Sequence, residues 1–340
     1  LDAEQLEVRR SMLETDGDRH RALRRLLQDE FTPKGLAGYE TFLRGLARVT
    51  VDAAVAKGSF DVVEDISADF PINVLVRLLD VPADHTGQLI AWGNRMIGNS
   101  DPDYADVLAD SEESEQYRLL PFRSPAAVEV FEYGFELAGR RRGGDASDLV
   151  SRLVNHVPED GVPLSDHDFR SYFLLLVVAG NETTRHAISH TIDALLDHPD
   201  QLATLQNEPS LIAPAVEECL RWASPVYHFR RTATRDVELH GRTIRAGDKV
   251  VAWFASANRD ERVFDEPYRF DVLRRRVDHV AFGKGGPHFC LGNQLARLEL
   301  RIMLEELVPR LPATLRRTGP VTRVRSNFVN GIKTFPVALA

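Results

Sequence analysis

The stretch Phe282-Gly-Lys-Gly-Gly-Pro-His-Phe-Cys-Leu-Gly292 is the most informative part of this sequence. Several glycines just before Cys290 allow a tight loop whose backbone N–H groups can point at the sulfur. A helical pattern follows from about 291 to 311, and the positive end of a helix favours a thiolate over a thiol. Glycines also permit the close backbone approach that a large cofactor face requires. The loop therefore indicates a cysteine thiolate that serves as a ligand.

Two other interpretations of this loop stay open on the residues alone. Cys290 could be a buried cysteine in a glycine-rich turn, where it behaves as a small hydrophobic side chain. His288 and Cys290 could also begin a zinc site, although no further Cys or His pair lies at ligand spacing.

A second motif, Ala179-Gly-Asn-Glu-Thr-Thr184, interrupts an apolar helical pattern that runs from 165 to about 196. Mid-helix Glu and Thr after an apolar run are costly unless something needs them. We expect Gly180 to weaken the helix and open a groove for a diatomic ligand. Thr183 would donate a hydrogen bond there, and Glu182 would relay protons from solvent. The alternative is a polar turn on an exposed face, with Thr bonded back to a backbone carbonyl.

Together these motifs resemble those of the cytochrome P450 family. The family signature Phe-x-x-Gly-x-x-x-Cys-x-Gly is matched at Gly286, Cys290 and Gly292, whereas Phe282 lies one position farther from the cysteine than the simplest pattern. The helical motif Ala/Gly-Gly-x-Asp/Glu-Thr-Thr is matched at every position. The form of both segments is similar to that of actinobacterial members.

The resemblance implies that Cys290 is the axial ligand of the iron in haem b. His20-Arg-Ala-Leu-Arg24 resembles the helix that binds the haem propionates, and Arg231 resembles a third donor, with Arg230 as its rival. His288 would bind a propionate as well. The residues implied at the cofactor are Cys290, His288, His20, Arg24, Arg231, Phe282, Gly286, Gly292 and Ala179, and those implied in catalysis are Thr183, Glu182 and Gly180.

Further residues are assigned to the pocket and to the scaffold. Glu218 and Arg221 lie three apart, so they share a helix face and can pair. The resemblance adds Arg269 as the third member of a buried ionic triad. Residues on the long helix, near two later strands and in the tail would line a mostly apolar substrate pocket, and they are Leu175, Val178, Tyr227, Phe229, Phe328 and Val329.

The hydrophobic periodicity predicts a mainly α fold with small β-sheets. Helical spacing covers 23–31, 68–79, 165–196 and 212–222, while 237–244, 248–253 and the tail 322–339 read as strands. We expect a single haem-thiolate domain over residues 1–340. In the family, further helices and a sheet precede the segment that contains His20, so we expect the fold to be incomplete at its N-terminus.

Bulk properties restrict the setting in which the protein acts. A net charge of −9 argues against nucleic acid as a partner. Two cysteines in 340 residues are typical of a reducing cytoplasm. The sequence opens without an apolar leader, and its longest apolar stretch, Phe173 to Gly180, is too short to span a membrane. We expect a cytoplasmic monomer.

The family resemblance implies a monooxygenase that hydroxylates an apolar small molecule (a sterol, lipid, terpenoid or polyketide-like compound) with dioxygen and two electrons. No flavin- or nicotinamide-binding fingerprint is present, so a ferredoxin with a ferredoxin reductase would supply the electrons. Basic residues beside the cysteine loop suggest docking near Lys284, Arg297 and Arg301. Alternatives are a haem-thiolate peroxygenase or isomerase, and a haem sensor without turnover.

Overall fold

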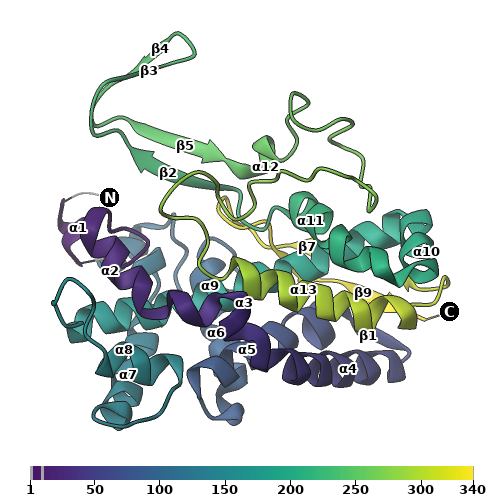
Figure 1. The fold of residues 1–340 in the computed structure, drawn as a ribbon, viewed down its shortest axis with the longest axis horizontal. Coiled ribbons are helices and arrows are strands. Elements are labelled where there is room, and N and C mark those ends of the chain that lie inside the picture. The colour runs from purple at the N-terminus through teal and green to yellow at the C-terminus, as the bar shows by residue number, and fades with distance from the viewer. Residues whose placement is uncertain (1–2, 9–10, 340) are drawn as a thin grey trace.

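The computed structural model describes residues 3–8 and 11–339, which form a helical body with small antiparallel sheets (Figure 1). Three-residue and other short helical turns connect the main helices. The α-helices are α1 Ala3–Val8, α2 Gly17–Gln28, α3 Pro33–Leu36, α4 Glu40–Ala56, α5 Asp69–Leu79, α6 Thr86–Ile97, α7 Ala126–Arg141, α8 Leu149–Asn155, α9 Asp166–Asp197, α10 Pro199–Asn207, α11 Ile212–Ala223, α12 Phe254–Ala257 and α13 Asn293–Leu307.

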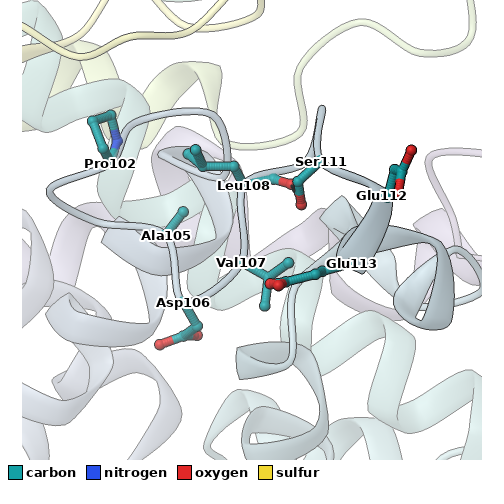
Figure 2. A pocket seen from close by; sticks show the side chains of 8 residues that line it. All are labelled: Pro102, Ala105, Asp106, Val107, Leu108, Ser111, Glu112 and Glu113. Atoms are coloured by element: carbon teal, nitrogen blue, oxygen red, sulfur yellow. Dashed lines mark hydrogen bonds between the residues drawn. The ribbon is translucent and has the colours of Figure 1, made fainter.

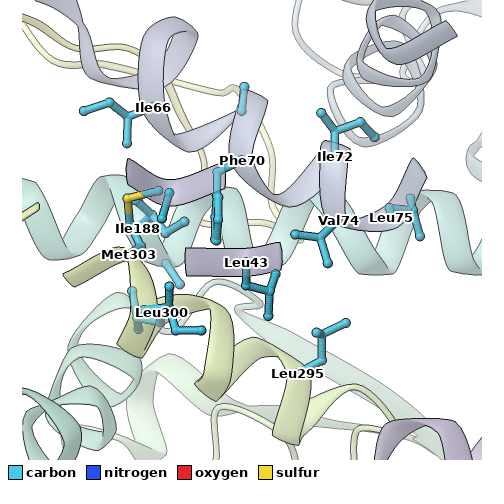
Figure 3. Packing of buried hydrophobic residues seen from close by; sticks show 14 of the residues in the cluster. Leu43, Ile66, Phe70, Ile72, Val74, Leu75, Ile188, Leu295, Leu300 and Met303 are labelled. Carbon is cyan, nitrogen blue, oxygen red and sulfur yellow. The ribbon is translucent and has the colours of Figure 1, made fainter. Parts of the chain in front are cut away.

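The long helix α9 is the centre of the body, and α5, α6, α7, α11 and α13 all pack against it. Ser165 begins it with a capping box, because its side chain accepts from the Asp168 N–H while Asp168 accepts from the Ser165 N–H. Along much of its length α9 is buried on all sides, as expected for a helix enclosed by others. Leu43 of α4 and Met303 of α13 meet Ile188 of α9 in this core (Figure 3).

The strands form small antiparallel sheets, and all but β1 come from the C-terminal half of the described chain. His228 pairs with Trp253 and Thr232 with Lys249, which fixes the register of the β2–β5 sheet. The β3–β4 hairpin projects from the body (Figure 1). The strands are β1 Ser59–Asp61, β2 His228–Thr232, β3 Val237–Leu239, β4 Arg242–Ile244, β5 Lys249–Trp253, β6 Arg316–Arg317, β7 Thr322–Arg323, β8 Ile332–Thr334 and β9 Pro336–Ala338.

The predicted fold class, mainly α with small β-sheets, is confirmed. The helix expected over 165–196 is α9, and the strands expected over 237–253 are β3, β4 and β5. The helix expected from about 291 begins at Asn293. No helix among residues 3–8 and 11–339 combines the length and apolarity needed to cross a bilayer.

Candidate functional site

The Cys290 loop is held by its own backbone. The Cys290 N–H donates to the Phe282 carbonyl (3.0 Å), which closes the loop at its two ends. Gly283 and Gly285 have φ of +72° and +73°, so these two positions require glycine. Gly292 is the N-cap of α13 and follows the cysteine by two residues. The loop therefore presents a half-buried Cys290 close to the N-terminus of a helix.

Opposing influences act on the Cys290 thiol. Burial raises its pKa, as for any buried thiol. The Gly292 N–H, which donates to the sulfur, and the positive charges of Arg24 and Arg297 act in the opposite direction. These groups supply what a coordinated thiolate needs, namely a donor to sulfur and compensating positive charge.

The structure brings His20, His288 and Arg24 together beside this loop. The His20 and His288 rings lie 4.2 Å apart between centroids, and His288 Nε2 bonds Asp16 Oδ1 (2.9 Å). His20 is 1% exposed, yet its Nδ1 has no hydrogen-bond partner among the described residues. Burial lowers the His20 pKa, and His288 and Arg24 lower it further. Within the described chain, the Arg24 side chain makes no hydrogen bond or ion pair.

Arg231, the predicted third propionate donor, lies on β2 and is exposed. Its Nη1 donates to the Arg230 carbonyl (3.0 Å), and its guanidinium carbon lies 6.0 Å from the centre of the Phe229 ring. Neither Arg231 nor Arg230 makes a contact with the histidine pair among the described residues, so their assignment stays a prediction.

One stripe of α9 is accessible although the helix is central. Between residues 171 and 192, the side chains are buried except at 175–176, 179–180 and 183, which are partly or fully exposed. Leu175, Ala179 and Thr183 are spaced by four, so they share a face, and Ala179 is exposed. Thr183 Oγ1 donates to the Ala179 carbonyl (3.0 Å), which is the back-bonded arrangement considered above. This stripe is the face of α9 that can meet a ligand.

The weakening of the helix expected at Gly180 is not observed. Helix α9 continues without a break from Asp166 to Asp197. A Cβ built on Gly180 would lie 3.3 Å from Leu75 Cδ1 of α5. The missing side chain thus serves close packing between two helices.

Glu182 does not face the stripe. Its side chain is 1% exposed, and its Oε2 pairs with Arg185 Nη2 (2.6 Å) and lies 3.5 Å from His186 Nε2. Arg185 is held in turn by Asn94 Oδ1 of α6 (2.8 Å). Burial raises the pKa of Glu182, but Arg185 and His186 outweigh it and the pKa lies below its usual range. The expected solvent path through Glu182 is absent in this arrangement, because the carboxylate is enclosed and ion-paired. Arg185 follows the same i,i+3 rule as Glu218–Arg221, so the sequence held the signal that we missed.

The predicted pocket residues separate into two groups. Leu175, Phe229 and Phe328 are partly exposed, and the last two rings meet edge to face at 5.5 Å. Val178 and Val329 are instead buried in the hydrophobic core at 6% and 1% exposure, so they do not line an open cavity.

Tyr227, which was predicted to line the pocket, already uses its hydroxyl within the protein. Its hydroxyl donates to Asn330 Oδ1 (2.9 Å) in the C-terminal hairpin.

The ionic triad forms with a different third member. Arg221 Nε and Nη2 bind the Glu218 oxygens at 2.6 and 2.7 Å, and both side chains are buried. Arg274, not Arg269, completes it, with Nε 3.0 Å from Glu218 Oε2. Arg269 contributes only its carbonyl, which accepts from Arg221 Nη2, while its exposed side chain pairs with Glu266. The prediction of Arg269 was therefore wrong.

The three basic residues suggested for docking are all engaged by carboxylates. Lys284 pairs with Asp278, Arg297 with Glu217, and Arg301 with both Glu40 and Glu305. None of these three is a free cation.

The residues present fit a haem. They offer a half-buried thiol with a donor to its sulfur and an accessible apolar stripe on α9. Among residues 3–8 and 11–339, neither the Nδ1 of the buried His20 nor the Arg24 guanidinium has a partner. In the part of the chain that is described, no cluster of three or more His, Cys, Asp or Glu side chains could hold a metal ion. In haem-thiolate proteins, a single cysteine thiolate is the protein ligand of the haem iron.

The loop between α6 and α7 lines a separate, open surface hollow of about 550 Å³ (Figure 2). None of its lining residues belongs to the predicted site, and Asp106 is already paired with Arg95 (2.7 Å). Its lining consists of Pro102, Ala105, Asp106, Val107, Leu108, Ser111, Glu112 and Glu113.

Comparison with known proteins agrees with this geometry. The model of the family described as Cytochrome P450 matches residues 139–337. A methyl-branched lipid omega-hydroxylase of Mycobacterium tuberculosis is 40% identical over 332 residues, which are 96% of this chain and 74% of that protein. A steroid C26-monooxygenase of Mycolicibacterium smegmatis is 36% identical over 328 residues, covering 96% and 72%.

Among solved structures, a Mycobacterium marinum cytochrome P450 in complex with pseudoionone superposes with a TM-score of 0.89 at 38% identity, covering 99% of this chain and 79% of that one. The chain belongs to the cytochrome P450 family. The prediction of a P450 monooxygenase is confirmed, and membership in the family implies a haem cofactor.

Proposed function

We propose that this protein hydroxylates an apolar lipid- or steroid-like molecule with dioxygen, using haem b bound through Cys290. The half-buried thiol carries the proposal, because it is held beside a helix N-terminus with the Gly292 N–H on its sulfur. Relatives named for methyl-branched lipids and steroids support an apolar substrate. The bound haem supplies the oxygen chemistry, and the protein supplies its ligand, its pocket and its protons.

The chain's own groups divide this work. His20, His288 and Arg24 would bind the propionates, since they gather at one edge of the Cys290 loop. Leu175 and Phe328 would exclude water from the substrate side. The Thr183 hydroxyl would donate protons on that side once it releases its bond to the Ala179 carbonyl.

We assign electron supply to a ferredoxin with its reductase, since the sequence has no nucleotide-binding fingerprint of its own. A cytoplasmic location is proposed from the use of only two cysteines. Reconstitution with a ferredoxin pair should then support turnover, and turnover with peroxide alone would count against the ferredoxin.

The test of the ligand uses both cysteines. In wild-type protein, carbon monoxide bound to the reduced haem should give the red-shifted Soret band of a thiolate complex. Cys290→Ser should abolish that band. Cys219→Ser is the matched control, because Cys219 is buried on α11 and its pKa is raised to about 12. An unaltered band in Cys290→Ser would refute the proposal.

A peroxide-driven or isomerising haem enzyme is the second candidate, and the enclosed Glu182–Arg185 pair favours it because those reactions need no proton delivery to dioxygen. Thr183→Ala separates the two. If dioxygen chemistry holds, product formed per electron pair should fall severalfold. Thr191→Ala removes the same kind of back-bond two turns later (2.8 Å to Ala187) and should leave the ratio unchanged. An unchanged ratio in Thr183→Ala would favour the second candidate.

A further inference from the structure

Arg297, on the second turn of α13, is gripped by a carboxylate from another helix. Its Nε and Nη2 lie 2.7 and 3.0 Å from the two oxygens of Glu217, which belongs to α11. This is the bidentate geometry in which arginine binds carboxylates most strongly. The guanidinium plane is therefore fixed in both position and orientation.

The same guanidinium reaches both ends of the Cys290 loop. Its carbon lies 4.5 Å from the centre of the Phe282 ring, a cation–π contact. Its Nη1 donates to Asn293 Oδ1 (2.9 Å), and Asn293 Nδ2 donates to the Cys290 carbonyl (2.8 Å). Phe282 in turn accepts the Cys290 N–H. Arg297 thus contacts Phe282, which begins the loop, and Asn293, which directly follows it.

His279 also binds the Glu217 carboxylate. The Ala281 N–H donates to His279 Nδ1 (3.1 Å), so the other ring nitrogen carries the proton and donates to Glu217 Oε2 (3.1 Å). Burial raises the pKa of Glu217, but His279 and Arg297 outweigh it and lower the pKa to about 2. Glu217 is therefore an anion throughout the neutral range, and its charge attracts Arg297 across that range.

We infer that Arg297, held by Glu217, is a positioning residue that fixes the Cys290 loop and thereby sets the reduction potential and ligation of the iron site. The inference rests on the proposed function, in which Cys290 binds haem iron. It also replaces the earlier suggestion that Arg297 docks a ferredoxin. The positive charge of Arg297 beside the sulfur stabilises the more negative, reduced state of the iron site. The bidentate contact of Arg297 with Glu217 stabilises the conformation of the Cys290 loop.

The test measures the ferric/ferrous midpoint potential and the carbon monoxide spectrum of the haem-loaded protein. Arg297→Gln should lower the potential and convert part of the thiolate band to the band of a protein without thiolate ligation. Glu217→Gln removes the opposite charge and should raise the potential. Arg297→Lys keeps the charge but loses the fork, so its potential should stay near wild type while the thiolate band is lost faster on heating.

A matched control is available elsewhere in the chain. Arg317 Nε and Nη2 bind Asp193 Oδ1 at 3.1 and 2.5 Å, and its guanidinium carbon lies 5.8 Å from the Phe335 ring. Arg317→Gln therefore deletes a comparable arginine–carboxylate contact between β6 and α9. It should lower the unfolding temperature without moving the potential or the band.

Each outcome decides the inference. Equal potentials and equal band stability in wild type and Arg297→Gln would overturn it. A lower ferredoxin-driven rate with an unchanged potential and spectrum would also overturn it, in favour of docking. If Arg297→Gln does not fold, Arg297→Lys tests the effect on the stability of the thiolate band, and Glu217→Gln tests the effect on the potential. Failure of the proposed function is distinguishable, because it would show as a missing thiolate band in the wild-type protein.

Discussion

Glu299 is a buried acid for which the described chain provides no cation. It lies on α13 at 1% exposure, and Thr184 of α9 donates a hydrogen bond to it. Burial raises its pKa to about 8, with only the Thr184 bond acting in the other direction. At neutral pH the native protein therefore holds Glu299 as a neutral carboxylic acid.

The sign of the pH effect follows from the two states. In the unfolded chain Glu299 loses its proton near its ordinary value of 4.5, whereas the native chain keeps it up to about 8. The unfolded state binds fewer protons across that window, so the free energy of unfolding falls as pH rises from 4.5 to 8. At about 1.4 kcal/mol per pH unit, the loss from this one group reaches about 3 kcal/mol at pH 7.

Glu299→Gln replaces the neutral acid by a neutral amide of the same shape and removes this linkage. We expect the variant to be more stable than wild type by up to about 3 kcal/mol at pH 7, with the gain vanishing near pH 4.5. Urea unfolding of both proteins at pH 5, 6, 7 and 8 measures the difference. The infrared band of a protonated carboxyl at pH 7 should disappear in the variant.

Glu306 on the same helix is the matched control. It is 6% exposed but paired with Arg48 and Arg310, which hold its pKa below the usual range although burial raises it. Its contribution is present above the unfolded pKa and is lost as pH falls, so Glu306→Gln should lose stability at pH 7 and not at low pH. The reasoning about Glu299 is refuted if Glu299→Gln is less stable than wild type at pH 8, or if its difference from wild type does not change with pH.

Two further predictions concern the ionic networks. Arg274→Ala should cost about 3–5 kcal/mol because it breaks a buried network at Glu218, whereas Arg269→Ala should cost about 0–1 kcal/mol, and equal unfolding temperatures would contradict the assignment of Arg274. Arg185→Gln leaves the buried Glu182 without its cation, so we expect the free energy of unfolding to fall by about 3–5 kcal/mol at pH 7. Adding Glu182→Gln should restore part of this loss, and a double-mutant cycle with no coupling would contradict the prediction.

Local signals in the sequence were sufficient for the helix that carries the site. The Ser165 capping box and the break at His198-Pro199 limit α9 within the chain itself, so its predicted and observed ends agree within one residue. The Cys290 loop was equally readable, because its turn needs glycine at Gly283 and Gly285 whatever surrounds it.

The third arginine of the triad could not be chosen in the same way. Arg269 and Arg274 are five residues apart in a segment without regular structure, where no periodicity says which side chain turns inward. In the folded loop the Arg269 carbonyl accepts a hydrogen bond from Arg221, and the Arg274 side chain points toward Glu218. Only tertiary contacts determine that choice.

The neighbours Glu182 and Thr183 show why adjacency in a helix is a poor guide to shared chemistry. Successive residues on an α-helix point about 100° apart, so two neighbours can face different surroundings. Thr183 continues the accessible stripe that includes Ala179, while Glu182 points into the body of the protein toward Arg185. A proton that passes from Glu182 to Thr183 must therefore travel around the helix, and the carboxylate must first leave its arginine. It follows that Arg185, which the sequence motif does not include, determines whether the two motif residues can act together.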